Sequence, residues 1–383
     1  MTATLEPTAP AYLDALDTII AGVVAPAAAE IDQTGAFPRA AIAALGQAGL
    51  LGLISAPAVG GLGQGPRAAA LVVERLAAAC GSTAMVVCMH YAATAVIEAH
   101  GAPEVRVAIA AGRHLATLAF SEAGSRSHFW APVSTATAAA SDGPVRLDAH
   151  KSWVTSAGQA DSYVWSSRPL AGAGASTLWL VPATAPGLQI PAPFNGLGLR
   201  GNSSSPVTAT GVAIPRTAML GPDGGGFDIM MGVVLPHFQV MNAAGSLGTM
   251  EAATRQTAAH AGGTRFEHLG SPLADLPTIR AYIARMRIKT DLVRGLLQDT
   301  LDALETGRPD TMLRVLEIKA AAGEAATEVT DLAMRVCGGA AFRKEVGVER
   351  HFRDARAATV MAPTTDVLYD FIGKAVCGLP LFG

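Results

Sequence analysis

Apolar residues recur every three or four positions along the first part of the chain, which is the spacing of one helix face. Residues 12–31 and 39–50 show this pattern, the second directly after Pro38. Alanine-rich stretches with the same period follow over residues 68–111. We therefore predict an N-terminal helical domain over residues 1–115.

The middle of the chain has short apolar runs separated by Gly, Pro, Ser and Asp, a pattern typical of β-strands and their turns. Such runs occupy residues 145–147, 163–165 and 177–181, and residues 207–214 alternate apolar and small side chains. The pattern predicts a small β domain over residues 116–222.

Long periodic stretches then return, over residues 227–261, 276–305 and 314–336. They predict a C-terminal helical bundle over residues 223–383, and the whole chain is then mainly α with a central β domain. Pro236 lies inside the first stretch, and proline cannot donate the backbone hydrogen bond of a helix interior. We expect a kink or a late helix start there.

The composition leaves this predicted fold unchanged and serves to exclude classes of protein and partner. The 383 residues are 50% hydrophobic and 15% charged, which suits a large buried core, and the net charge of −3 gives no sign of a nucleic-acid partner. Mean hydropathy is high, at +0.34. However, Glu74, Arg75 and Glu98 interrupt the best apolar stretches, and a membrane span needs roughly 20 consecutive apolar residues. We predict no transmembrane helix and no membrane partner.

Targeting and metal-binding patterns are also absent from the sequence. The first residues lack the basic and apolar run of a signal peptide. The four cysteines have no metal-binding spacing, and the nine histidines include no His-Glu-x-x-His motif. We expect a cytoplasmic protein that holds no metal.

Two segments of the predicted β domain could hold a flat polar cofactor. Residues 121–127 offer hydroxyls and backbone N–H groups where a strand ends, which suits hydrogen bonding to a polar ring or a phosphate. Trp153 and Thr155 lie two apart on a strand and so share a face, where one could stack on a ring and the other donate to it. The alternatives are a polar turn and a buried pair in a sheet core.

The motifs, taken in order along nearly the whole chain, resemble those of the acyl-CoA dehydrogenase family. Residues 59–63 are similar to its early glycine turn, residues 121–127 to its Thr-Glu-Pro flavin loop, and residues 151–158 to its Lys-x-Trp-Ile-Thr-Asn strand. Residues 337–339 with 353–355 resemble its C-terminal signature. The resemblance implies a helix–β-barrel–helix architecture, FAD as cofactor and a homo-oligomer, usually a tetramer.

The resemblance also implies roles for individual residues. Ser121 and Thr155 would hydrogen-bond the flavin ring, Trp153 would pack against it, and Ser127 would lie near the cofactor phosphates or the thioester arm. Thr364 and Asp366 would contact the adenosine part of the cofactor. Gly338, Gly339 and Arg265 would contact the FAD of a neighbouring subunit. An electron-transfer flavoprotein is the candidate electron acceptor.

The sequence departs from the family at the base that removes the substrate α-proton. Ala362 stands where the family's glutamate normally lies, and alanine cannot accept a proton. Some members carry the base on the long helix after the β domain, where this chain has Phe238, followed by Gln239. Asp366 and His237 are weak candidates for a substitute base. His90 is expected to pack beside the substrate pocket.

Three hypotheses follow from the resemblance and the departures. The first is an FAD-dependent oxidoreductase, similar to an acyl-CoA dehydrogenase, that acts on an acyl thioester linked to CoA or to a carrier protein. The second is a relative that does not dehydrogenate and instead performs desulfination, elimination, cyclisation or flavin-dependent monooxygenation. The third is a non-catalytic flavin-binding subunit of an enzyme complex.

Overall fold

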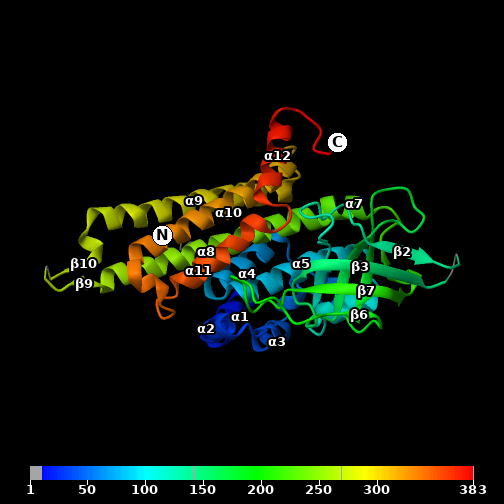
Figure 1. Cartoon of the computed structure of the whole chain (residues 1–383), viewed down its shortest axis with the longest axis horizontal. Helices are drawn as coiled ribbons and strands as arrows, with labels where there is room; N and C mark the ends of the chain where they lie inside the picture. The colour runs from blue at the N-terminus through cyan, green and yellow to red at the C-terminus, as the bar shows by residue number, and fades with distance from the viewer. Residues whose placement is uncertain (1–10, 141–142, 269, 383) are drawn as a thin grey trace, which may run out of the picture.

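The computed structural model of the chain describes residues 11–140, 143–268 and 270–382. A β domain forms one end of the molecule, long helices form the other, and the shorter N-terminal helices lie along one side (Figure 1). In chain order the β domain lies between two helical parts, which is the fold class predicted from the sequence.

The N-terminal part is helical, as the periodicity predicted. Its helices and helical turns are α1 (Ala11–Ile19), η1 (Ile20–Val24), α2 (Ala25–Thr34), α3 (Arg39–Gln47), η2 (Leu50–Gly52), η3 (Pro57–Val59), α4 (Pro66–Ala79), α5 (Gly81–His100) and α6 (Pro103–Ala110). Helix α5 is buried on most of its surface because it packs against α4, β1 and α8 at once.

By length and apolar composition alone, two helical stretches could cross a membrane, Ala11–Thr34 and Gly81–His100. In the second, 78% of the most apolar window is buried inside the fold. In the first, which lies near the N-terminus, 22% of the window is buried. Core helices and signal sequences pass the same test, so the absence of a membrane span stays a prediction.

The middle of the chain forms two four-stranded sheets. One has the order β1 (Ala116–Ala119), β4 (Ser162–Ser167), β5 (Thr177–Pro182) and β8 (Met219–Leu220), with β1 and β4 parallel and the other pairs antiparallel. The other is antiparallel and has the order β2 (Thr135–Ala138), β3 (Val145–Val154), β7 (Ser205–Ile214) and β6 (Leu188–Gln189).

The β-barrel expected from the resemblance is wrong in this respect. Within the described residues the outer strands of the two sheets do not pair with each other, so no closed barrel forms. Strand β3 alternates buried and exposed residues along most of its length, which a sheet with one solvated face requires. Strand β4 is buried at every position because it lies inside the first sheet and beneath α5.

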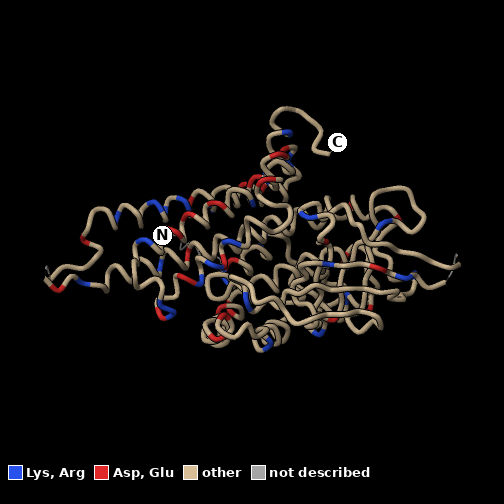
Figure 2. The backbone as a smooth tube through the Cα atoms, viewed as in Figure 1, with Lys and Arg blue, Asp and Glu red and all other residues tan. Residues whose placement is uncertain are grey.

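The C-terminal part is the predicted helical bundle. After the turn η4 (Arg216–Ala218), its elements are α7 (Gly226–Ile229), η5 (Met230–Val234), α8 (Leu235–Gly263), the hairpin β9 (Arg265–Phe266) and β10 (Ser271–Pro272), η6 (Leu273–Asp275), α9 (Pro277–Thr306), α10 (Thr311–Cys337), η7 (Gly338–Phe342), α11 (Val348–Val360) and α12 (Thr365–Val376). Both signs occur along this bundle, and on α9 the first half carries mostly basic residues whereas the last turns carry acidic ones (Figure 2).

Pro236 marks an irregularity, as predicted, although the helix is not interrupted. The five residues before α8 form the π-helical turn η5, and the proline occupies the first turn of α8. Proline has no N–H to donate to the preceding turn, and a widened turn tolerates this loss. The helix therefore runs on from α7 and presents Val234, Leu235 and Phe238 towards the β domain.

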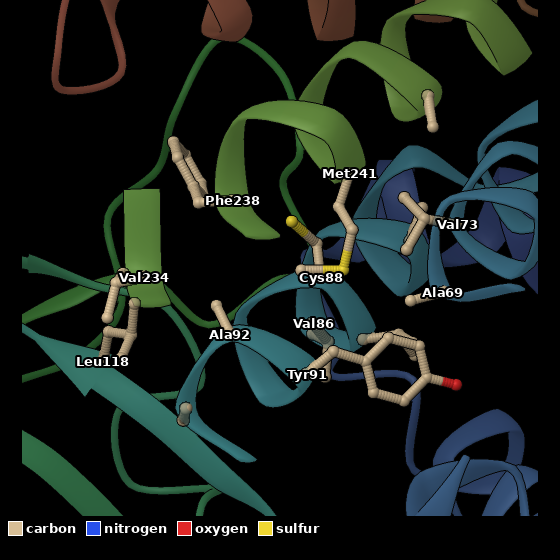
Figure 3. Packing of buried hydrophobic residues seen from close by; sticks show 14 of the residues in the cluster. Ala69, Val73, Val86, Cys88, Tyr91, Ala92, Leu118, Val234, Phe238 and Met241 are labelled. Carbon is tan, nitrogen blue, oxygen red and sulfur yellow. The ribbon is translucent and has the colours of Figure 1, made fainter. Parts of the chain in front are cut away.

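One continuous core joins the two helical parts where α4, α5 and α8 meet. Figure 3 shows Val73 of α4, Cys88 and Tyr91 of α5 and Met241 of α8 packed within it. Phe238 lies at the edge of this cluster, near Val234 and Leu118.

Candidate active site

A cavity of about 560 Å³ lies between the β domain, α5, the start of α8 and the segment after α11. It brings together residues that are far apart in sequence. Seven of the residues predicted for cofactor or substrate line it: Ser121, Ser127, Trp153, Thr155, Phe238, Ala362 and Thr364.

The wall on the β-domain side is held by backbone hydrogen bonds. The Ser152 N–H donates to the Ser121 carbonyl at 2.8 Å, and the Thr117 hydroxyl donates to the Thr155 carbonyl at 2.9 Å. Strand β3 has a register shift between residues 151 and 154, so the simple two-residue alternation fails there. Trp153 and Thr155 nevertheless both line the cavity, as the sequence predicted.

A buried ion pair lies beneath this wall. Glu122 follows Ser121, and its Oε1 accepts a hydrogen bond from Lys151 Nζ at 2.5 Å and from the Ser134 hydroxyl at 2.6 Å. Its Oε2 accepts from the N–H groups of Val133 and Ser134. Burial acts to raise the pKa of Glu122, but Lys151 and these hydrogen bonds outweigh it and hold that pKa below its usual value. The pair joins the 121–127 loop to β3.

The opposite wall is the segment after α11, which is also held in place. The Thr364 N–H donates to the Ser127 hydroxyl oxygen at 2.9 Å, which joins the two walls. Lys319 of α10 donates from Nζ to the carbonyls of Ala358, Met361 and Pro363 at 3.0, 3.0 and 2.7 Å. Sequence reasoning missed Lys319, because a lysine within a periodic helix indicates a solvated position.

The β-domain wall has the donors and the aromatic surface that a flavin ring needs. Among the residues that the structure describes, the hydroxyls of Ser121 and Thr155 have no hydrogen-bond partner, so both remain for a ligand. The Trp153 side chain is 61% exposed, and its ring lies 4.2 Å from that of Phe194, centroid to centroid. An exposed indole beside two free hydroxyls suits a planar, polar heteroaromatic group.

The cavity has no available base. Of its lining residues within the described chain, only Glu122 carries a carboxylate and none is a histidine. That carboxylate is already paired with Lys151. Ala362 and Phe238, at which the sequence resemblance leads one to expect a base, both line the cavity. Among the described lining residues there is therefore no free carboxylate or imidazole.

The two weak base candidates lie outside the set of lining residues. Asp366 is exposed in the first turn of α12. The Nδ1 of His237 hydrogen-bonds the Val233 carbonyl at 2.8 Å, and burial lowers the pKa of that imidazole. Gln239, predicted for the substrate pocket, is fully buried in α8 and also lies outside the lining set. Both of its amide atoms lack a partner among the described residues.

Three residues implied to act across subunits lie far from the cavity. Arg265 opens the β9–β10 hairpin at the end of the bundle opposite the β domain (Figure 1). Its guanidinium donates to the Gly270 carbonyl at 3.1 Å. Gly338 and Gly339 are exposed in η7, after α10 has run back towards that same end. None of them lines this chain's own cavity.

His90 packs beside the cavity within α5 and does not line it. Its Nε2 lies 3.0 Å from the Leu51 carbonyl, and its Nδ1 accepts from the Ala116 N–H at 3.1 Å. Nδ1 must therefore be unprotonated and Nε2 must carry the hydrogen. Burial lowers the pKa of His90 to about 4, so the ring is neutral at pH 7.

Acid should destabilise the protein through His90. The folded-state pKa lies below the unfolded value near 6.5, so the unfolded chain binds the extra proton first as the pH falls. We expect His90 to contribute a loss of up to about 3 kcal/mol in the free energy of unfolding between pH 7 and pH 4. The His90→Gln variant should lack this part of the acid sensitivity in denaturant titrations. The exposed His150→Gln should keep it, and equal behaviour of the two variants would contradict the assignment.

Several lining residues had no clear signal in the sequence. Arg126 belongs to the 121–127 segment but adopts a positive φ of 50°, which its sequence does not indicate. Met85 and Met89 come from α5, where helical spacing could have placed them together. Asn202 and Ser204 come from the irregular segment before β7, whose position depends on tertiary contacts.

Comparisons with known proteins agree with this geometry. Sequence models of the acyl-CoA dehydrogenase N-terminal, middle and C-terminal domains match residues 7–111, 117–212 and 224–377. The human mitochondrial short-chain specific acyl-CoA dehydrogenase is 29% identical over 350 residues, which are 89% of this chain and 83% of the relative. Cyclohex-1-ene-1-carbonyl-CoA dehydrogenase of Geobacter metallireducens is 27% identical over 382 residues, 95% and 96% of the two chains.

Solved structures share the fold at lower sequence identity. Butyryl-CoA dehydrogenase from Megasphaera elsdenii superposes with a TM-score of 0.90 at 22% identity and covers 97% of this chain and 100% of its own. A glutaryl-coenzyme A dehydrogenase bound to glutaryl-CoA gives the same score at 23% identity, over 98% of each chain. The three domain matches in their order, the relatives that span nearly the whole chain and the shared fold place this chain in the acyl-CoA dehydrogenase family of FAD flavoproteins.

Proposed function

We propose that the chain binds FAD in the cavity and acts as an oxidoreductase on an acyl thioester, linked to CoA or to a carrier protein. The observation that carries the proposal is the wall formed by Ser121, Trp153 and Thr155, which offers two free hydroxyls and an exposed indole. The family's activity supports the same function.

Each wall has a distinct part in this proposal. FAD, when bound, supplies the acceptor for a hydride. Ser121 and Thr155 hydrogen-bond the flavin ring, and Trp153 packs against it and keeps water from one side. Ser127 and Thr364 close the contact between the two walls and so fix the width of the cavity. Phe238 and Ala362 supply apolar surface for the acyl group.

The absent base favours a second candidate function. Removal of an α-proton needs an acceptor within hydrogen-bond reach, and the described cavity offers no free carboxylate or imidazole. A relative that performs desulfination, elimination, cyclisation or flavin-dependent monooxygenation needs no carboxylate at this place when its first step is not α-deprotonation. This candidate uses the same flavin and the same thioester cavity.

Removing the Thr155 hydroxyl should weaken FAD binding. Thr155→Val keeps the shape of the side chain but loses one hydrogen bond to the flavin, and a single hydrogen bond contributes about 0.5–1.5 kcal/mol. The dissociation constant of FAD should rise about 2- to 10-fold in equilibrium dialysis. Thr359→Val, at a hydroxyl that donates to the Arg356 carbonyl, is the control and should leave it unchanged. Equal affinities in all three proteins would contradict the flavin position.

An anaerobic titration of the FAD-loaded protein with short, medium and branched acyl-CoAs tests the proposed function. Bleaching of the visible flavin band by any of them supports oxidation of the thioester. A saturable shift without bleaching supports the second candidate. A band that no thioester alters would overturn both.

We further propose a homo-oligomer, and a tetramer because that is the usual state in the family. In it, Arg265, Gly338 and Gly339 contact the FAD of a neighbouring subunit. Their exposure at the end of the bundle supports this, because they do not line this chain's own cavity. Asp366, exposed at the start of α12, would lie near the adenosine part. An electron-transfer flavoprotein is proposed as the acceptor, and the cytoplasm as the location.

A further inference from the structure

A second, smaller chamber adjoins the main cavity. It has a volume of about 40 Å³ and lies between α4, α5, α8 and α11. Met85, Leu199 and Ala357 line both spaces and so form the partition between them. Figure 3 shows Val73, Cys88 and Met241, which belong to its apolar lining, close together where the three long helices meet.

One side of this chamber is polar although it is buried. Asn242 of α8 is 4% exposed, and its Oδ1 has no hydrogen-bond partner among the described residues. Its Nδ2 donates a hydrogen bond to the sulfur of Met361 at 3.4 Å. An amide oxygen buried without a partner destabilises the fold, so the chamber is built to receive a donor there.

Asp354 of α11 adds a second acceptor. Its Oδ1 accepts from the Leu199 N–H at 2.6 Å, which leaves Oδ2 with free lone pairs. Gly81, the first residue of α5, approaches this carboxylate so closely that a Cβ there would lie 2.7 Å from Oδ2. Burial raises the pKa of Asp354 to about 6, so the carboxyl is mainly an acceptor at pH 7.5.

The remaining polar groups do not change this balance. The Thr249 hydroxyl already donates to the Gly245 carbonyl at 3.0 Å. Ser246 is the other polar residue of the lining, and its hydroxyl can donate or accept. The chamber therefore offers acceptors in excess of donors and excludes a carboxylate, which would repel Asp354. Its volume suits one small group, since a water needs about 10–15 Å³ of such space.

We infer that this chamber binds a hydroxyl or amino group carried on the acyl chain, so that the substrate class is a hydroxyacyl or aminoacyl thioester. The inference rests on the proposed function, because the group is carried on a thioester seated in the main cavity. A hydroxyl donates to either Asn242 Oδ1 or Asp354 Oδ2, and an amino group donates to both.

Matched pairs of acyl-CoAs test the inference in the FAD-loaded protein. Each pair has the same chain length, from three to six carbons, and one member ends in a methyl group while the other ends in a hydroxyl or an amino group. The dissociation constant is measured from the change in the flavin band under anaerobic conditions. For at least one length the hydroxylated thioester should bind about tenfold or more tightly than its methyl counterpart.

Variants separate the chamber from other causes of such a preference. Asn242→Leu should remove or reverse the preference. Thr254→Val is the control, because Thr254 is also a buried residue of α8 with an unpartnered hydroxyl but lies outside the chamber lining. It should keep the wild-type preference. If Asn242→Leu does not fold, Asn242→Ala, which removes the amide and adds neither bulk nor charge, should also remove the preference.

The outcomes distinguish this inference from the proposed function. Thioesters that alter the flavin band but show no preference for a hydroxyl or amino group at any length would overturn the inference alone, and the chamber would then hold only water. A preference that survives in Asn242→Leu would also overturn it. A flavin band that no thioester alters would overturn the proposed function and the inference with it.

Discussion

Lys151→Met is expected to lower the free energy of unfolding by about 3–5 kcal/mol, because it leaves the carboxylate of Glu122 buried without its counter-ion. Glu122 and Lys151 are 2% and 1% exposed, so water cannot replace the lost partner. The change also removes the hydrogen bonds from Lys151 to the carbonyl and hydroxyl of Ser166, at 2.7 and 3.0 Å. Equilibrium unfolding in urea, followed by far-UV circular dichroism, measures the effect.

An exposed ion pair is the matched control. Lys374 and Asp370 form a pair one turn apart on α12, with 32% and 59% of their side chains exposed. Lys374→Met should cost less than about 1 kcal/mol, since exposed pairs contribute little. A double variant, Glu122→Leu with Lys151→Met, should recover part of the stability. If Lys151→Met unfolds at the same denaturant concentration as Lys374→Met, the buried pair does not stabilise the β-domain wall of the cavity.

Ala362→Glu is expected to speed flavin reduction by a short acyl-CoA by about 10²- to 10⁴-fold, the usual contribution of a positioned base. Ala362 lines the cavity, and Lys319 hydrogen-bonds the carbonyls of Met361 and Pro363 on either side of it. The backbone that carries the new carboxylate is therefore fixed. Anaerobic stopped-flow measurement of the flavin band gives the rate in the wild type and the variant.

Ala362→Gln is the control for this gain of function. Its side chain has the length of glutamate, but an amide cannot take up the proton, so the rate should stay within a few-fold of the wild type. Both variants must hold FAD for the comparison to count. A glutamate variant no faster than the glutamine variant would mean that more than the base has been lost.

Much of the fold could be predicted because each long helix buries one face against a common core. A strand was expected directly before residue 121, where β1 lies, but β2 was missed, since its sequence, Thr-Ala-Thr-Ala, lacks alternation of large apolar residues. Strand β1 is defined by its parallel pairing with β4, more than forty residues later. The barrel was expected from the resemblance, and the pairing of the outer strands decides against it.

Some residues of the site could likewise be predicted from the sequence, and others could not. Its β-domain wall could be predicted, because Ser121, Trp153 and Thr155 lie in motifs whose order is itself informative. Lys319 and Asn242 could not, since each lies inside a helix and gains its role only where several helices meet. The resemblance led us to expect a base at the position of Ala362, but only the structure shows that the described lining residues offer no free carboxylate or imidazole.

Solvent exchange of the substrate α-protons tests the central claim most directly, namely that the flavin cavity receives a thioester but holds no base. The protein would be incubated anaerobically in D₂O with an acyl-CoA at a concentration that saturates the change in the flavin band, and deuterium at the α-carbon would be measured by mass spectrometry. We predict no uptake above the rate in buffer, and uptake in Ala362→Glu. Rapid uptake in the wild type would contradict the account, because it would require a base that this cavity does not show.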